Sequence, residues 1–468
     1  MSAPSTTTDS RRLRAAAGRA RLAVVLPVSL LATLATMVVS YLGKAECGGP
    51  PFDRFGRSAH FPVGHGGTQW MPCYSDIMYL WVGRDINNHV FPYIHGGIGA
   101  DGKLFGGVVE YPVLSGLLMY FGASGAHTDS DFLLHSAILL APFGLAITVL
   151  LAVVARWHVL WWAATPPLIL YSFHNWELPV AFTVVLAVAV MAWGSSISPR
   201  TGERRIPLLP TASLTSVILA VGFCLKLYPG LFILPLAVYV LLHDRARRDW
   251  RGGFAVLAVG TLTVVAIQVP FMVAGFDGWK ASLSFQGKRK SDVDTNSIWY
   301  WGLRHFFGGQ TPAYNSAVGV LSPIMILAAF ALAVYLGYRV HRAGGAYPWI
   351  GVSASMLAAF ILFHKVHSPQ YTLWILPFFV LLRVRWPVIA AYLIGDLILD
   401  STIFRLFGIY VSHSPMKWWV ITGVNVGVWI QVALLAMLIV VFVRSPLREP
   451  LASVGRRPTA PDREAISA

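Results

Sequence analysis

Residues 22–42 read LAVVLPVSLLATLATMVVSYL, a stretch without a single charged side chain. An uninterrupted apolar run of about 20 residues is long enough to cross a bilayer as an α-helix. It is too long for the core of a signal peptide, and no small-residue cleavage pattern follows it. The segment just before it is rich in arginine: Arg11, Arg12, Arg14, Arg19 and Arg21. We therefore expect a retained first transmembrane helix, preceded by a basic cytoplasmic tail over residues 1–21.

The rest of the chain repeats this pattern. Of its 468 residues, 56% are hydrophobic and only 12% are charged, whereas soluble domains have about 25% charged residues. Apolar runs long enough to span a bilayer recur along the sequence, and no long polar block separates them. We predict an all-α polytopic membrane protein with one membrane domain, residues 22–443. Residues 444–468 are rich in Pro, Arg and Ala and predict a disordered cytoplasmic tail.

Arginine clusters between the apolar runs set the predicted topology, because short loops rich in Lys and Arg stay in the cytoplasm. The clusters are at Arg156, Arg200/Arg204/Arg205, Arg245/Arg247/Arg248/Arg251, Arg339/Arg342 and Arg383/Arg385. If all face inward, the helices between them pair into about 12 spans with both termini inside. The predicted spans are 22–43, 132–155, 158–174, 178–196, 211–225, 227–242, 253–276, 315–338, 347–363, 368–382, 386–404 and 418–443.

This topology leaves two long extracytoplasmic loops, residues 44–107 and 277–314. The apolar segment 111–122 is too short to cross, so we expect a juxtamembrane or re-entrant helix there. Lys288, Arg289 and Lys290 lie in the second loop, although the positive-inside rule disfavours outward positive charge. An anionic partner such as a lipid phosphate would explain them. Alternatively, the loop is simply long enough to be translocated regardless of charge.

Two of the three cysteines, Cys47 and Cys73, fall in the first outer loop. That side of the membrane is oxidising, so we predict a disulfide between them. The third, Cys224, lies in an apolar run and is expected to be a small core residue.

Polar side chains gather in the predicted outer segments, and no comparable set is found in the inner loops. Ionisable groups at membrane depth are costly and usually functional. The candidate site residues are Tyr74, Asp76, Glu110, Tyr111, Asn175, Glu177, Lys226, Lys288, Arg289, His364, Lys365, His367, Gln370 and Tyr371.

Several of these residues have structural alternatives. Asp76 precedes an apolar-periodic run and could be a helix N-cap. Glu110 could pair with a nearby Arg or Lys, and Lys226 could extend from a helix end to the interface. Asp292-Val293-Asp294 has the DxD spacing of metal-dependent nucleotide-sugar enzymes, but a three-residue pattern is weak. We predict no metal and no cofactor.

The order of these motifs resembles that of GT-C glycosyltransferases. The motifs are Asp76 in the first outer loop, Glu110-Tyr111-Pro112, Asn175-Trp176-Glu177 and the Lys226-Leu227-Tyr228-Pro229 break. More narrowly, the chain resembles glycosyltransferase family 87, the actinobacterial mannosyltransferases that use polyprenyl-phosphate-mannose to build glycolipids. The resemblance implies a GT-C-like fold in the plasma membrane, with the active site on the extracytoplasmic side. It also implies that Asp76 is the catalytic base, and that His364 and His367 lie near the donor phosphate.

On this hypothesis Asp76 takes the proton of an acceptor hydroxyl as that oxygen attacks the anomeric carbon. Cations stabilise the leaving polyprenyl phosphate; the candidates are Lys226, His364, Lys365 and His367, with Lys288 and Arg289 behind them. The substrate-binding candidates are Tyr74, Glu110, Tyr111, Asn175, Glu177, Gln370 and Tyr371. The expected partners are the lipid-linked donor, a glycolipid or glycan acceptor and membrane lipids, with no nucleic acid.

Two other classes of function remain open at this point. A lipid flippase or transporter would also have about 12 helices and cationic sites for a phosphate headgroup. Transporters often contain repeated halves with binding residues near the midplane, whereas this sequence shows no repeat and its polar groups lie on one face. The other alternative is an inactive scaffold with an enzyme-like fold.

Overall fold

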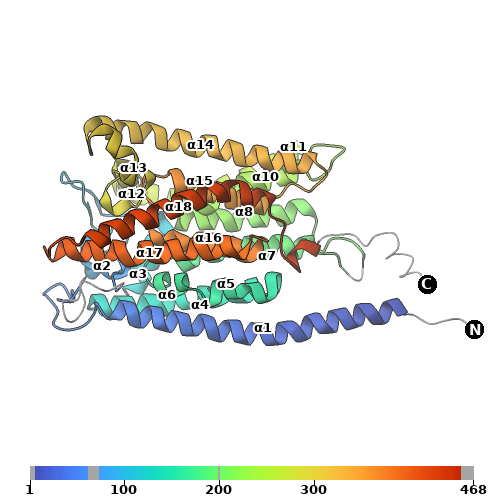
Figure 1. Cartoon of the computed structure of the whole chain (residues 1–468), viewed down its shortest axis with the longest axis horizontal. Helices are drawn as coiled ribbons and strands as arrows, with labels where there is room; N and C mark the ends of the chain where they lie inside the picture. The colour runs from blue at the N-terminus through green and yellow to red at the C-terminus, as the bar shows by residue number, and fades with distance from the viewer. Residues whose placement is uncertain (1–5, 62–72, 199–200, 455–468) are drawn as a thin grey trace, which may run out of the picture.

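The computed structural model describes residues 6–61, 73–198 and 201–454, and these are almost entirely helical. In the described chain the strands are limited to a small antiparallel hairpin, in which β1 (Gly97–Ile98) pairs with β2 (Leu104–Phe105). Figure 1 shows the long helices side by side along one direction. They are α1 (Thr6–Ala45), α4 (Asp129–Ala155), α7 (Glu177–Ser195), α8 (Leu208–Leu225), α11 (Trp250–Ala274), α14 (Pro312–Arg342), α17 (Trp386–Val411) and α18 (Trp418–Arg444).

Shorter helices complete the bundle. Those within it are α5 (Leu160–Ala163), α6 (Pro166–Tyr171), α9 (Tyr228–Leu231), α10 (Ile233–Leu241), α15 (Trp349–Phe363) and α16 (Thr372–Leu381). A second group, α2 (Asp76–Gly83), α3 (Val113–Gly122), α12 (Phe276–Lys288) and α13 (Ile298–Trp301), lies at one end, which we call the site end. Helix α1 begins, and the described chain ends, at the opposite end (Figure 1). Single 3-10 turns occur at 86–88, 156–159, 293–295, 303–307, 369–371 and 451–453.

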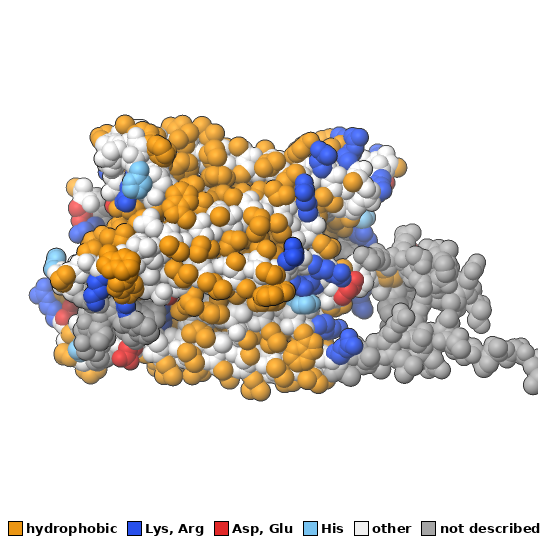
Figure 2. Space-filling view, viewed as in Figure 1, with side chains coloured by type: hydrophobic (Ala, Val, Ile, Leu, Met, Phe, Trp, Pro, Cys, Tyr) orange, Lys and Arg blue, Asp and Glu red, His pale blue; other side chains and the backbone are white. Residues whose placement is uncertain are grey.

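The surface of the bundle is that of a membrane protein. Eight helical segments of the described chain are long and apolar enough to cross a membrane, judged by length and composition. Figure 2 shows hydrophobic side chains over the middle of the visible face, with Lys and Arg concentrated towards its ends. Large apolar side chains such as Leu262, Val273 and Leu327 are more than 60% exposed, which suits contact with lipid rather than water. The predicted all-α membrane architecture is confirmed, while the count of 12 crossings stays a prediction.

The region predicted as one helix over 158–174 is broken into pieces. The chain reverses at Arg156, which has φ of 54°, and forms a 3-10 turn, α5 and α6. Pro166 and Pro167 lack the N–H that a continuing helix needs, so one helix stops before them and α6 starts with them. The segment still returns to the site end. There the His174 carbonyl accepts a hydrogen bond from the Asp76 N–H.

Two other boundaries bear on the site. The predicted span 386–404 continues to Val411 in α17, and its added turns form part of a cavity wall described below. The segment 111–122 contains α3, whose 10 residues extend only about 15 Å at 1.5 Å per residue. Ser115 of α3 donates to the Leu225 carbonyl, where α8 ends. The helix therefore packs against the site end of the bundle.

The first residues of the segment predicted as a C-terminal tail are bonded to the bundle. The Arg383 N–H donates to the Pro446 carbonyl, and the Arg448 N–H donates to the Leu381 carbonyl. Residues 445–454 are thereby held against the end of α16, and residues 455–468 lie outside the described chain.

Candidate active site

Asp76 is the first residue of α2, and the start of that helix is fixed to the turn between α6 and α7. Ser75 is the N-cap: its Oγ accepts from the Ile77 N–H and donates to the Phe173 carbonyl at 2.9 Å. The Asp76 N–H donates to the His174 carbonyl at 2.8 Å. Ser75 rather than Asp76 therefore caps the helix. The Asp76 carboxylate is left to face the cavity, with its side chain 22% exposed.

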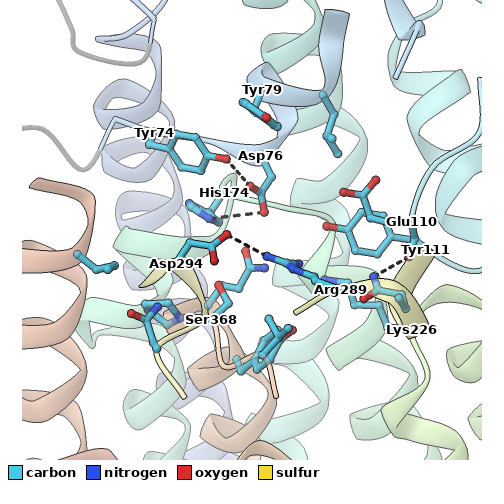
Figure 3. A pocket seen from close by; sticks show the side chains of 18 of the residues that line it. Tyr74, Asp76, Tyr79, Glu110, Tyr111, His174, Lys226, Arg289, Asp294 and Ser368 are labelled. Carbon is cyan, nitrogen blue, oxygen red and sulfur yellow. Dashed lines mark hydrogen bonds and ion pairs between the residues drawn. The ribbon is translucent and has the colours of Figure 1, made fainter. Parts of the chain in front are cut away.

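Neutral donors hold this carboxylate in place (Figure 3). The Tyr74 hydroxyl donates to Asp76 Oδ1 at 2.9 Å, and Asn175 Nδ2 donates to Oδ2 at 2.7 Å. Asn175 Nδ2 also donates to the Tyr111 hydroxyl at 2.8 Å, which leaves the phenolic proton of Tyr111 for another acceptor. Burial and then the nearby Asp76 charge raise the pKa of Tyr74 and of Tyr111 well above the usual value. Both phenols therefore stay protonated and can act as donors.

A cavity of about 830 Å³ opens beside Asp76 and carries both polar and apolar walls. Its polar side includes Asp76, Glu110, Lys226, Arg289 and Gln370. Its apolar side comes mainly from α12 and the extended end of α17: Leu283, Phe285, Ile403, Phe404, Phe407, Tyr410 and Val411. A space of this size, with a few polar groups converging on one part of it, is typical of a ligand site.

Lys226 and Glu177 form a buried ion pair, which the sequence did not predict. Lys226 Nζ donates to Glu177 Oε1, and Trp374 Nε1 donates to Glu177 Oε2 at 2.6 Å. Glu177 is fully buried and does not line the cavity, so its predicted contact with substrate is not supported. Lys226 does line the cavity, where it lies 4.8 Å from the centre of the Tyr111 ring. Its charge is offset by Glu177, which weakens the predicted role in binding the donor phosphate.

Glu110 also has a cationic partner. Arg84 Nε and Nη2 donate to its two carboxylate oxygens at 2.8 and 3.1 Å. Such a pairing of Glu110 with a nearby Arg or Lys is one of the structural alternatives that the sequence leaves open. Two hydrogen bonds between one guanidinium and one carboxylate make this a strong ion pair. Glu110 lines the cavity, but both of its carboxylate oxygens are engaged by Arg84.

Of the basic residues predicted in the second loop, Arg289 alone lines the cavity. Its Nη2 lies 3.4 Å from Asp294 Oδ2, so the charge is only partly neutralised (Figure 3). Burial works against the charged form, but the Asp294 carboxylate prevails and raises the pKa of Arg289. Lys365 Nζ donates to the Gly287 carbonyl, and Lys288 is exposed. Neither lines the cavity, so neither is placed to contact a phosphate there.

The two histidines of the 364–367 turn are buried, which disfavours the cationic form that we expected. Burial lowers the pKa of His364 and of His367 to about 4, so both rings are neutral at pH 7. His364 lines the cavity and could offer a hydrogen bond, whereas His367 does not line it. The His367 N–H donates to the Thr295 carbonyl, which ties this turn to the second outer loop.

Gln370 and Tyr371 both line the cavity, as expected for substrate-binding residues. Tyr371 stacks on Trp374 with ring centres 3.8 Å apart, and Trp374 stacks on Tyr228 at 4.4 Å. Gln370 is 5% exposed, and within the described residues its Oε1 atom has no hydrogen-bond partner. A buried polar atom without a partner is costly, and a substrate hydroxyl could satisfy it.

The described structure gives no support for a metal site. Asp292 caps a 3-10 turn, accepting from the Val293 N–H, and Asp294 pairs with Arg289. In residues 6–61, 73–198 and 201–454, no three His, Cys, Asp or Glu side chains are close enough together to hold a metal ion. The structure also places Cys47 and Cys73 in a disulfide, with Cα atoms 5.4 Å apart, behind the start of α2.

Sequence reasoning missed part of this region. Lys44, at the end of α1, is 2% exposed and donates to the Tyr74 carbonyl. Asp396 and Asp400 are buried on α17. A signal was available, since carboxylates inside a predicted span are unusual, but their contacts come from segments far away in sequence.

Comparison with known proteins identifies the family. The model of glycosyltransferase family 87 matches residues 110–369, more than half of the chain. The chain belongs to glycosyltransferase family 87. It is therefore a glycosyltransferase with membrane helices, and the family-level resemblance predicted from short motifs is confirmed. The family 87 match includes Glu110, Asn175, Lys226 and Arg289, whereas Asp76 lies before it. No curated protein and no solved structure shows significant similarity to the chain.

Proposed function

We propose that this glycosyltransferase moves mannose from a polyprenyl-phosphate donor to a glycolipid or glycan acceptor, on the extracytoplasmic side of the plasma membrane. One observation carries the proposal. Glu110 and Asp294 also line the cavity, but each is paired with an arginine. Asp76 accepts hydrogen bonds from the neutral Tyr74 and Asn175 side chains, and no Lys or Arg of the described chain forms an ion pair with it.

That difference suits a general base. A carboxylate held by an arginine is a counterion, and it would lose a strong interaction on taking up a proton. Asp76 is partly exposed to the cavity and is oriented by its neighbours, so an acceptor hydroxyl could reach it. As the hydroxyl oxygen bonds to the anomeric carbon, its proton passes to Asp76. The bond from that carbon to the phosphate oxygen breaks, and the electron pair leaves with the phosphate.

Attack opposite the leaving group inverts the anomeric configuration. A β-linked donor would therefore give an α-linked product. The leaving phosphate gains negative charge, and Arg289 is a cavity cation whose charge is only partly neutralised by Asp294. A monophosphate leaving group does not need a metal ion to bridge two phosphates.

The apolar wall supports a lipid-linked substrate. Phe404 and Phe407 of α17 line the cavity, and the same wall continues to Tyr410 and Val411, which are 49% and 54% exposed. The wall thus connects the polar part of the cavity to the outer surface of the bundle. A polyprenyl chain could lie along it while its phosphate reaches Arg289.

The test is transfer from polyprenyl-phosphate-[14C]mannose to endogenous lipids, in membranes with and without the protein. Parallel reactions use the arabinofuranose and glucose donors on the same lipid. Label in a new glycolipid from the mannose donor alone supports the proposal. Transfer from one of the other donors would replace mannose. Movement of labelled donor across proteoliposomes without any transfer would favour a flippase.

A further inference from the structure

Lys44 contacts both residues that flank the Asp76 carboxylate. Its Nζ donates to the Tyr74 carbonyl at 2.9 Å and lies 3.4 Å from His174 Nδ1. Tyr74 in turn donates to Asp76 Oδ1, and His174 Nε2 lies 3.8 Å from Asp76 Oδ2. The buried Lys44 ammonium, on α1, therefore contacts Tyr74 and His174, the two residues next to the Asp76 carboxylate oxygens on α2.

Asp400 is a buried carboxylate whose charge acts on this ammonium. Asp396 and Asp400 are one turn apart on α17, and each is 1% exposed. Asp396 is hydrogen-bonded by Thr372 at 2.5 Å and by Tyr171 at 3.1 Å. Asp400 Oδ1 has no hydrogen-bond partner among the described residues, and the Asp400 charge is the strongest that acts on Lys44. A lone charge in this interior would be costly, so the two groups stabilise each other.

The contact with Lys44 bears on where His174 carries its proton. An ammonium group can only donate hydrogen bonds, so Nδ1 facing Lys44 should be the unprotonated nitrogen. The proton of the neutral ring then lies on Nε2, the atom that faces Asp76. The Tyr74 carbonyl also lies close to the ring and would favour the opposite tautomer. That oxygen already accepts from Lys44, however, and a proton on Nδ1 would point at a positive charge.

We propose that Lys44 is a positioning residue for the Asp76 base: it holds His174 in the tautomer that directs Nε2–H at Asp76. The idea rests on the proposed role of Asp76. In the uncomplexed enzyme the Nε2 to Oδ2 distance is longer than a hydrogen bond, and such contacts often tighten when substrate binds. Lys44 thus acts through His174 and Tyr74 rather than on the substrate itself.

The proposal has a consequence for turnover. Replacing Lys44 together with Asp400 removes one positive and one negative charge, so the net charge of this region is unchanged. What the double variant loses is the contact that orients the His174 ring towards Asp76. We therefore expect kcat to fall more than KM changes.

Two variants separate positioning from folding. Lys44→Met alone leaves Asp400 buried without its cation and is expected to lower the yield of folded protein. Lys44→Met/Asp400→Asn removes both charges and should restore the yield. Lys103→Met is the matched control, because Lys103 is an exposed lysine at the same end of the bundle, on the β-hairpin.

The first readout needs no turnover. Solid-state 15N NMR of histidine-labelled protein gives the ring tautomers, and a His174→Gln sample assigns the His174 signal. We expect Nε2–H in the wild type and a loss of that preference in the double variant. An Nδ1–H tautomer in the wild type would overturn the proposal, whatever the variants do.

The second readout is the rate of transfer from polyprenyl-phosphate-[14C]mannose. The double variant should show kcat lowered more than KM is changed, while Lys103→Met should match the wild type. A folded double variant with the wild-type tautomer and the wild-type kcat would make Lys44 purely structural. If Asp76→Asn keeps its turnover while NMR still shows the His174 proton on Nε2, the assignment of Asp76 as the base fails. The tautomer assignment then stands.

Discussion

Replacing Lys226 by Met should destabilise the protein because it leaves a buried charge without its partner. Glu177 is 0% exposed and Lys226 is 7% exposed, and the two are in direct contact. Removing one member of such a pair costs about 3–5 kcal/mol, because the remaining carboxylate stays in an apolar interior. The residual hydrogen bond from Trp374 to Glu177 Oε2 is worth about 1.5–3 kcal/mol and does not make up the loss.

The double variant Lys226→Met/Glu177→Gln should recover most of this stability. Methionine fills the space of the lysine stem, and the glutamine amide oxygen can still accept from Trp374. Replacing a buried pair as a unit is often nearly neutral, so we expect a free energy of unfolding within about 1 kcal/mol of the wild type. Because Glu177 offsets the Lys226 charge, removing both leaves the net charge of the cavity unchanged, and turnover should stay within about tenfold, or 1.4 kcal/mol, of the wild type.

Unfolding by SDS in mixed micelles, followed by tryptophan fluorescence, measures the free energies for both single variants and the double variant. Lys103→Met, an exposed lysine variant, should be unchanged. The reasoning is refuted if the double variant is as unstable as Lys226→Met. A stable double variant that has lost transfer would instead restore the role of Lys226 as a phosphate-binding cation.

Three further predictions follow from the same contacts. His367 has a pKa lowered to about 4 by burial against about 6.5 when unfolded, so its stabilising effect is complete above pH 6.5 and is lost as the pH falls towards 4. About 2 kcal/mol should disappear between pH 8 and pH 5, and thermal unfolding of His367→Gln should show a flatter pH dependence; an equally steep one would contradict the assignment. Arg289→Met should lower transfer by about 2–4 kcal/mol of barrier with unchanged expression, and Asp294→Asn, which leaves the Arg289 cation in place, is the control; equal losses in both would argue against a phosphate contact. Replacing both Cys47 and Cys73 by Ser opens a loop of about 27 residues and should cost about 3–4 kcal/mol, seen as a lower unfolding midpoint, whereas a midpoint insensitive to reductant in the wild type would exclude the disulfide.

The sequence predicted the helical membrane architecture well because apolar runs and arginine clusters are local signals. It failed where proline interrupts the pattern, as at Pro166, and where a helix continues beyond its apolar run, as α17 does from Phe404 to Val411. Asp76 could be singled out because a carboxylate in the first outer loop is unusual by itself.

Pairing could not be predicted in the same way. Glu177 and Lys226 are separated by 49 positions and Arg84 and Glu110 by 26, so nothing in either local sequence indicates that they meet. The charge state of His367 depends equally on burial by distant segments. These are tertiary properties. Of the six expected phosphate-binding residues, they leave Arg289 as the one that lines the cavity as a cation without a fully buried ion-pair partner.

Whether Asp76 is the base can be tested most directly by single-turnover transfer from polyprenyl-phosphate-[14C]mannose, comparing purified wild type with Asp76→Asn in proteoliposomes. Asparagine keeps the size of the side chain, and it can still accept a bond from Tyr74. The account predicts normal folding and donor binding with transfer reduced by at least about 100-fold. Near-normal transfer by Asp76→Asn would contradict it.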